Sequence, residues 1–355
     1  MVAPSEPLPA PSVTAALDVE GSAPLRLIQV DALVVMKIIK HSQSFFPSPV
    51  TGQLLGLDVN GVLEVTSSFP FPSAGADGKA ATATGGAGGA RYQAEMMRCL
   101  REVNVDNNTV GWYQSAYLGS FLNSQVVEAQ FAYQKTLSEK SVVLVHDVSG
   151  GARSMLRAFR LSKGFVQSYK EGKFTEESLA RNGVTHRSIL EELPLEIKNS
   201  HLLTTLLHSA PLDPEAGLSL TAPLTPNLDS VLDLVIDPYL EKNLEFLLEA
   251  VDEYQSETSN LQYHQRALAR EQSRINTWLS RRRAENLQRS SSGQPPLDED
   301  WKKTGMFKVP QEPSRLEGLL VSAQIEQYCG QVSGRAGGVL GRMYGVREGV
   351  GRSEP

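Results

Sequence analysis

Few side chains in this 355-residue sequence are spaced for catalysis or metal binding. The six histidines are scattered, and the closest two, His201 and His208, are separated by two helical turns, too far for chelation from adjacent turns. Cys99 and Cys329 lie far apart, and the sequence contains no Cys-x-x-Cys pair. It also contains no Gly-x-Ser-x-Gly nucleophile motif and no His-Glu-x-x-His zinc motif. These patterns argue against the common hydrolase and zinc-binding classes.

Two weaker motifs also favour ordinary structural roles. His146 precedes Asp147, but neighbouring residues of a strand point to opposite faces, so an acid–base pair is not expected. The glycine run 85–89 is followed by Ala90 and Arg91 without the lysine of a P-loop, so a nucleotide site is not expected either.

Composition indicates a soluble protein with a substantial core. Hydrophobic residues make up 41% and charged residues 21%, with a net charge of −6, which excludes fibrous and wholly disordered classes. No apolar run approaches the length of a membrane span, and residues 1–24, rich in proline, resemble a disordered tail rather than a secretory signal. The two widely separated cysteines are typical of a reducing compartment, so the sequence predicts a cytoplasmic protein. Its length predicts two folded units.

Residues 25–210 predict one α/β domain that alternates strands and helices. The clearest local signal is a hairpin of Val50–Val59 and Val62–Phe71, because Asn60-Gly61 supplies the positive φ angles of a two-residue turn. Residues 73–90 are predicted to be a flexible Gly/Ala insertion. Periodicity predicts the other elements: a strand from Leu25 to Val30, a helix over Ala32–His41 capped by Asp31, a helix over Tyr92–Val103, a strand over Thr109–Gln114, a helix over Ser124–Leu137 with Val127, Phe131 and Leu137 inward, a strand over Val142–His146, a hairpin of Arg157–Leu161 with Phe165–Tyr169, a strand over Glu192–Ile197, and a helix from Asn199.

Three of these segments resemble the MPN (JAB/Mov34-like) domain, an α/β fold with a mixed central sheet shared by zinc isopeptidases and their inactive relatives. They are the Asp31-capped helix, the strand segment Gly52–Gly56 and the strand segment Val110–Ala116 with its following helix at Ser124. The resemblance covers about residues 25–210.

The positions that carry zinc chemistry in active MPN domains are altered here. By the resemblance, Gln114-Ser115-Ala116 replaces His-x-His, Ser124 and Val127 stand where Ser and Asp would be, and Pro49 replaces the catalytic Glu. Alanine and valine have no donor atoms, and proline cannot shuttle a proton. We therefore expect no bound metal, no cofactor and no catalytic residue; Ser124 suffices as a helix N-cap. The competing hypothesis is a zinc-dependent isopeptidase, a deubiquitinase.

A helical region is predicted after the MPN domain. Prolines mark a linker over 211–227, and a long helix is predicted over 228–290, with Asp237 and Pro238 as its start signal. A heptad pattern places one fully apolar column on this helix, which predicts a partner-binding seam in a helical bundle: Leu240, Leu247, Tyr254, Leu261, Leu268 and Ile275. A second linker follows over 291–315, and then a C-terminal helix over 316–345 that could fold back on the long one and fray after Gly330.

The long helix is electrically polarised, with acids in its first half and arginines in its second. One interpretation is an RNA or ribosome contact through Arg266, Arg270, Arg274, Arg281, Arg282 and Arg283. The alternative is that these charges complement the helix dipole and keep a long helix soluble. The alternative is favoured, because no aromatic residues are interleaved for base stacking.

Finer motifs resemble the h-subunit family of eukaryotic translation initiation factor three, whose MPN domain is catalytically degenerate. They are Val30–His41, Gly111–Phe121, Glu196–Leu202 and Gly293–Leu297. This resemblance implies a scaffold that pairs with the f-type MPN subunit, joins a helical bundle beside PCI-domain subunits and supports preinitiation complex assembly on the small ribosomal subunit, without a membrane contact. Degenerate MPN subunits of the proteasome lid and the COP9 signalosome are the alternatives.

Overall fold

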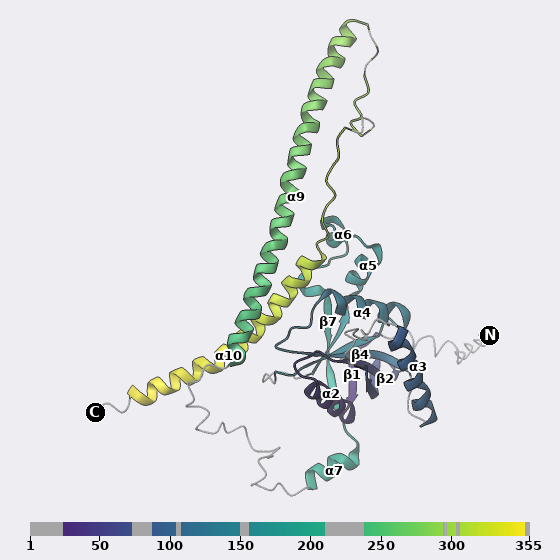
Figure 1. The fold of residues 1–355 in the computed structure, drawn as a ribbon, viewed down its shortest axis with the longest axis vertical. Coiled ribbons are helices and arrows are strands. Elements are labelled where there is room, and N and C mark those ends of the chain that lie inside the picture. The colour runs from purple at the N-terminus through teal and green to yellow at the C-terminus, as the bar shows by residue number, and fades with distance from the viewer. Residues whose placement is uncertain are drawn as a thin grey trace, which may run out of the picture.

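The computed structural model describes residues 24–72, 87–103, 108–149, 156–209, 238–293, 295, 297–302 and 306–351. These residues form a sheet domain and a helical arm that extends away from it (Figure 1). Four predicted segments lie outside the described residues: the tail up to residue 23, residues 73–86 of the Gly/Ala insertion, the linker 211–227 and residues 228–237 of the long helix.

An eight-stranded mixed sheet forms the centre of the domain, which confirms the predicted fold class. Its spatial order is β7-β6-β5-β4-β2-β3-β1-β8. Strand β1 is parallel to β3 and β8, and β4 is parallel to β5, while the other neighbours are antiparallel. The strands are β1 Leu27–Asp31, β2 Thr51–Val59, β3 Val62–Pro70, β4 Thr109–Ala116, β5 Val142–Asp147, β6 Leu156–Leu161, β7 Leu190–Leu193 and β8 Leu195–Lys198.

The predicted hairpin is present as β2 and β3. Val59 pairs with Val62 across the turn, and both Asn60 and Gly61 have positive φ angles, 54° and 81°. These angles belong to a tight turn whose twist matches the twist of the two strands. The hairpin lies inside the sheet, because β4 pairs with β2 and β1 with β3.

Helices cover both faces of the sheet. On one face, helix α2 (Ala32–Ser44) buries Val34 and Ile38 against Ile28, Leu54 and Leu144. On the opposite face, α4 (Ser124–Thr136) and α5 (Lys163–Glu171) pack on alternate residues of the same strands. The remaining helices are α3 Ala87–Glu102, which packs on Leu55, Phe69 and Phe71 of the β2–β3 region, α6 Glu176–Arg181, η1 His186–Ser188 and α7 His201–Ser209. Residues 87–90, predicted to be part of the flexible insertion, are the first turn of α3, so that boundary was wrong.

The hairpin predicted for Arg157–Leu161 and Phe165–Tyr169 is wrong in its second half. Residues 163–171 form α5, because Ser162 caps the helix by accepting a hydrogen bond from the Phe165 amide at 3.3 Å. Phe165 is fully buried, and Tyr169 four residues later contacts the same cluster. The spacing of these two aromatic residues is helical, and the capping serine was the missed signal.

The single strand predicted for Glu192–Ile197 is also wrong, since two short strands occupy this stretch. Pro194 separates β7 from β8, because a proline lacks the amide hydrogen that a continuous ladder needs. Strand β7 pairs with β6 while β8 pairs with β1, at the two ends of the strand order. One short stretch of chain therefore joins both edges of the sheet.

Two long helices build the arm. Helix α9 (Pro238–Ser291) has 54 residues and so spans about 80 Å at 1.5 Å per residue. Helix α10 (Leu316–Gly351) crosses its lower end, next to the sheet domain (Figure 1). The predicted fraying after Gly330 is wrong, since α10 continues to Gly351. Each glycine lowers helix stability by about 1 kcal/mol, and these glycines weaken the helix without ending it. Within the described part of the chain, none of the helices is both long and apolar enough for a bilayer.

Candidate functional site

The sheet brings the positions of the altered zinc site together. Strands β2 and β4 are antiparallel, with Thr51 opposite Gln114. The Ser115 amide donates to the Val50 carbonyl at 2.9 Å, and the Val50 amide donates to Ser115 Oγ at 2.8 Å. This register places Pro49 beside Ala116, so two of the altered positions lie next to each other.

Apolar side chains fill the site where zinc ligands would converge. Ala116 and Val127 are buried in one cluster, with exposed fractions of 4% and 1%. Pro49 is exposed and Gln114 is half-buried. Among the described residues, no three His, Cys, Asp or Glu side chains are grouped to hold a metal ion. The residues present do not fit a hydrolytic zinc ion, which needs three donor side chains and a carboxylate base.

The predicted cap of α4 needs correction. Asn123, rather than Ser124, is the N-cap, because its side chain accepts a hydrogen bond from the Val126 amide at 2.9 Å. Ser124 is the first helical residue and is exposed. Leu137, predicted to point inward, is half exposed just beyond the last turn, whereas Val127 is buried as predicted.

The two aromatic residues of the Gly111-Trp112-Tyr113 motif have structural roles on opposite faces of β4. Trp112 Nε1 donates to Gln130 Oε1 at 2.8 Å, and Gln130 Nε2 donates to the Ser141 carbonyl at 2.8 Å. On the other face, the Tyr113 hydroxyl lies 3.0 Å from His41 Nδ1. Burial raises the pKa of Tyr113 and lowers the pKa of His41, so both groups are held neutral near pH 7.

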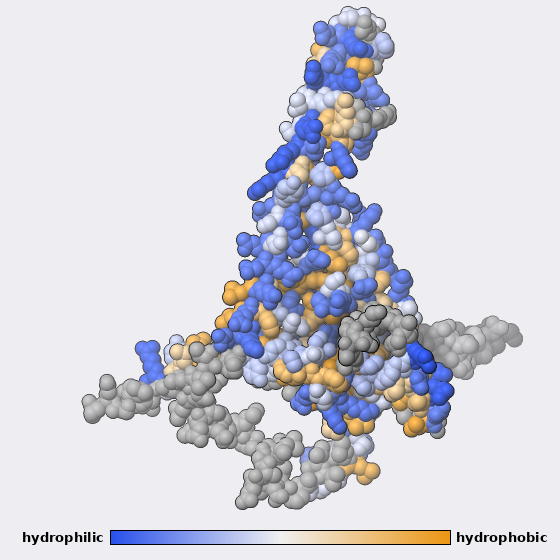
Figure 2. Space-filling view, viewed as in Figure 1, coloured by the Kyte–Doolittle hydropathy of each residue, from blue (hydrophilic) through white to orange (hydrophobic). Residues whose placement is uncertain are grey.

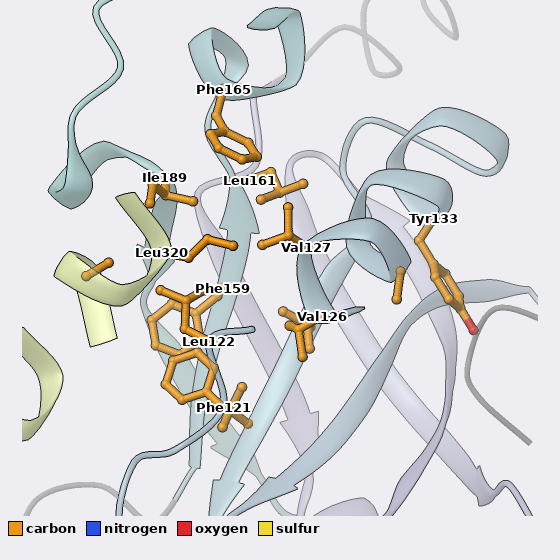
Figure 3. Close-up of a cluster of buried hydrophobic side chains, with 14 of the residues drawn as sticks. Phe121, Leu122, Val126, Val127, Tyr133, Phe159, Leu161, Phe165, Ile189 and Leu320 are labelled. Carbon is orange, nitrogen blue, oxygen red and sulfur yellow. The ribbon is translucent and has the colours of Figure 1, made fainter. Parts of the chain in front are cut away.

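Helix α10 covers the loop between β4 and α4, which sequence reasoning missed. Gln324 Nε2 donates to the Gly119 carbonyl at 2.7 Å, and Gln324 Oε1 accepts from the Leu122 amide at 3.0 Å. Leu320 of α10 points into the cluster that contains Val127 and Phe159 (Figure 3). The signal in the sequence was the 3-and-4 spacing of apolar residues in 316–323, which gives this helix an apolar face. The loop is therefore fixed by the chain's own C-terminal helix.

A second contact of α10 fixes the lower end of α9. Val321 and Tyr328 of α10 are buried with Ala250 of α9, and Phe246 packs on them. The Phe246 ring lies 6.3 Å from that of Tyr117 in the sheet domain and 6.1 Å from that of Tyr328. The predicted fold-back of the C-terminal helix on the long helix is thus present, but only at the base of the arm.

The predicted seam of α9 changes direction along the helix. In a straight α-helix, positions seven residues apart are offset by about 20° around the helix axis. A column with a seven-residue repeat therefore drifts slowly from one face of the helix to another. Near the base Tyr254 is 45% exposed, whereas near the tip Ile275 is only 7% exposed. Of the other seam residues, Leu240, Leu247, Leu261 and Leu268 are half-buried.

Near the tip, the chain's own return segment packs along α9. The Trp278 ring lies 5.9 Å from that of Phe307, His264 Nε2 lies 3.3 Å from the Pro310 carbonyl, and Asn286 Nδ2 donates to the Leu297 carbonyl at 3.0 Å. The seam near the tip therefore faces the chain itself. Near the base, Leu247 packs against the cluster that joins α9 to α10, while Tyr254 is exposed.

Most of the arginines proposed for RNA contact are paired within the chain. Arg274 pairs with Glu271, Arg281 and Arg282 with Glu285, and Arg283 with Glu299. Of the six, only Arg266 and Arg270 have no ion-pair partner among the described residues. The RNA hypothesis now rests on these two and remains a prediction.

Comparisons with known proteins agree with this architecture. Residues 24–139 match the family model described as JAB1/Mov34/MPN/PAD-1 ubiquitin protease, and residues 150–348 match the model described as the C-terminal region of eIF3h. The h-subunit of eukaryotic translation initiation factor 3 from Coccidioides immitis is 47% identical over 92% of this chain and 97% of its own length. The h-subunits from Aspergillus terreus and Emericella nidulans are 47% and 45% identical over 92% and 91% of this chain, and over 97% and 95% of their own lengths. The chain therefore belongs to the h-subunit family of eukaryotic translation initiation factor 3.

Proposed function

We propose that this protein is a non-catalytic scaffold subunit that enters the initiation factor three complex mainly through the base of its helical arm. The observation that carries this proposal is an exposed row of large apolar side chains on α9: Leu244, Leu248 and Val251, here named the apolar row. Leu248 is 66% exposed. The sheet domain supports the same conclusion, because apolar side chains fill its altered zinc site and α10 covers the adjoining loop.

The sheet domain contributes a second contact in this proposal, pairing with the f-type MPN subunit. Its helix α2 leaves Leu33 and Met36 more than half exposed on the side away from the sheet, and exposed apolar groups of this kind favour a protein contact. The arm would join a helical bundle beside PCI-domain subunits. The assembled complex would act in the cytoplasm, where it supports preinitiation complex assembly on the small ribosomal subunit.

The test is to place charges on the apolar row in the full chain. In Leu244→Asp/Val251→Asp, two carboxylates would have to be buried without partners upon docking, which costs several kcal/mol each. We expect recovery of co-expressed initiation factor subunits to fall at least tenfold, while the melting temperature of the free chain stays unchanged. The matched control is Ser256→Asp/Asn260→Asp, which adds two charges on another face of α9. Undiminished recovery with the first variant would contradict the docking role.

The absence of catalysis is a separate part of the proposal. We expect no stoichiometric zinc by elemental analysis and no cleavage of ubiquitin dimers, because Ala116 and Val127 have no donor atoms and Pro49 cannot act as the base. One tightly bound zinc ion per chain, or isopeptidase activity removed by a chelator, would establish the competing isopeptidase hypothesis.

A further inference from the structure

A line of exposed carboxylates borders the apolar row of α9. Glu241, Glu245 and Asp252, here named the acidic row, are spaced by four and seven residues and so lie on one face of the helix, along one edge of Leu244, Leu248 and Val251. All three acids are exposed, and none has an ion-pair partner among the described residues. Figure 2 shows hydrophobic residues gathered around the lower end of the arm, next to hydrophilic ones, while the upper shaft is mostly hydrophilic. The base of α9 therefore offers one surface that is both apolar and negatively charged.

The acidic row is unfavourable for α9 on its own. Glu241 and Glu245 are four residues apart on one face, and like charges at that spacing destabilise a helix. Glu241 lies in the first turn, where the positive end of the helix dipole stabilises a carboxylate. Glu245 and Asp252 lie beyond that turn and are not stabilised in this way. A cationic neighbour would remove this repulsion, whereas a neutral or acidic neighbour would leave or increase it.

We propose that the occupant of the apolar row is an amphipathic helix of another subunit that carries lysines or arginines along the edge facing Glu241, Glu245 and Asp252. This inference rests on the assembly role proposed above and adds the charge of the partner. A helix suits the surface, because residues spaced by three and four form a ridge that fits the groove of a second helix. The apolar contact supplies affinity, and the charges fix the choice and the orientation of the partner.

A second copy of this chain fits the surface poorly. If two copies overlapped at their apolar rows, their acidic rows would be brought together, which is repulsive. If the basic upper half of one copy met the acidic lower half of the other, the apolar row would face a polar stripe of α9 that includes Gln272, Ser273 and Asn276. Neither arrangement satisfies both the apolar and the charged groups, so a different chain is the better partner.

The experiment compares charge reversals in the full chain co-expressed with the other initiation factor subunits. Glu245→Lys/Asp252→Lys reverses the acidic row, and Glu249→Lys/Glu253→Lys makes the same change in net charge on another side of the same turns. We expect the first variant to recover its partner subunits about tenfold less well or worse at physiological salt, the control to match the parent, and parent recovery to fall as salt rises. Circular dichroism of each purified chain verifies folding. If the charge-reversed variant misfolds, the neutral Glu245→Gln/Asp252→Gln variant replaces it, and its recovery of partner subunits is expected to lie between those of the parent and the reversal.

Each alternative outcome separates this inference from the assembly role. Undiminished recovery with the acidic row reversed or neutralised, alongside loss with Leu244→Asp/Val251→Asp, would overturn the charge inference and keep the docking role. Equal loss in both charge variants would show a net-charge effect and also overturn the inference. A stable dimer of the isolated chain in light scattering, abolished by the Asp substitutions in the apolar row, would make a second copy the occupant and overturn it as well.

Discussion

The sheet domain and the base of the arm differ in how deeply their large apolar side chains are buried. In the sheet domain, Trp112, Phe165 and Val127 are almost completely buried, and a second layer from α10 covers the loop next to the altered zinc site. On α9, Leu244 and Leu248 remain exposed beside acids that have no ion-pair partner in the part of the chain that the structure describes. The domain therefore buries a core of its own, whereas the described residues leave the apolar row of α9 uncovered. In the proposal above, the domain supplies a folded mount with a secondary contact at α2, and the base of the arm supplies the principal contact.

The largest expected effect comes from opening the core of the sheet domain. Trp112→Ala removes a buried indole and leaves Gln130 without its donor, so the free energy of unfolding should fall by about 3–5 kcal/mol. Urea denaturation followed by circular dichroism measures this change. The control is Val103→Ala at an exposed site, which should change it by less than about 0.5 kcal/mol. A small effect of Trp112→Ala would mean that the domain does not bury a core of its own.

A smaller effect is expected from loosening α10 on the domain. Gln324→Ala leaves the Leu122 amide and the Gly119 carbonyl without their partner, which should cost about 1–3 kcal/mol. Thermal unfolding of the full chain measures the loss, with Gln288→Ala at an exposed site of α9 as the matched control. If both variants melt alike, α10 does not hold the loop.

Replacement of the N-cap of α4 should have a comparable or weaker effect. Asn123→Ala should lower the free energy of unfolding by about 0.5–2 kcal/mol, because the Val126 amide loses its acceptor. Ser124→Ala, one residue later, should change it by less than about 0.5 kcal/mol. Denaturant titration of both variants distinguishes the two positions, and a larger loss at Ser124 would restore the assignment made from sequence.

The smallest effect concerns pH. Burial lowers the pKa of His146, although the neighbouring Asp147 opposes this shift. A histidine whose pKa is lower in the folded state contributes stability above its unfolded pKa of about 6.5, and this stability is lost as the pH falls through the folded pKa. Unfolding free energy should therefore decline from pH 7 to 5.5, by no more than about 1.4 kcal/mol per pH unit for one group. His146→Leu should flatten the decline; equal slopes in the parent and the variant would contradict this assignment.

Sequence reasoning was most successful where one local signal determined the structure. The Asn60-Gly61 turn, the helix after Asp31 and the long helix after Pro238 are all present. It failed where local signals for a strand and for a helix overlapped. After Ser162 a strand was predicted, but the capping serine and the helical spacing of Phe165 and Tyr169 favour the helix that is present. Pro194 likewise divided one expected strand into two.

The surroundings of the candidate site could be predicted only in part. Pro49, Ala116 and Val127 could be assigned to the altered zinc site from the resemblance, but the register of β2 with β4 is a long-range pairing that the β2–β3 hairpin does not fix. The contact of Gln324 with the loop joins residues about 200 positions apart and depends on how α10 packs, which no local pattern specifies. The direction of the α9 seam could not be predicted either. A heptad pattern identifies the residues of the seam, but it does not show which neighbouring segment each part of a straight helix faces.

Hydrogen exchange on the free chain and on the assembled complex tests the central claim most directly, because it compares both regions in one measurement. Backbone amides of residues 240–256 should gain protection upon assembly, while those of the altered zinc site, residues 114–127, should exchange alike in both states. Protection gained mainly at 114–127, with 240–256 unchanged, would contradict the account and place the principal contact on the sheet domain.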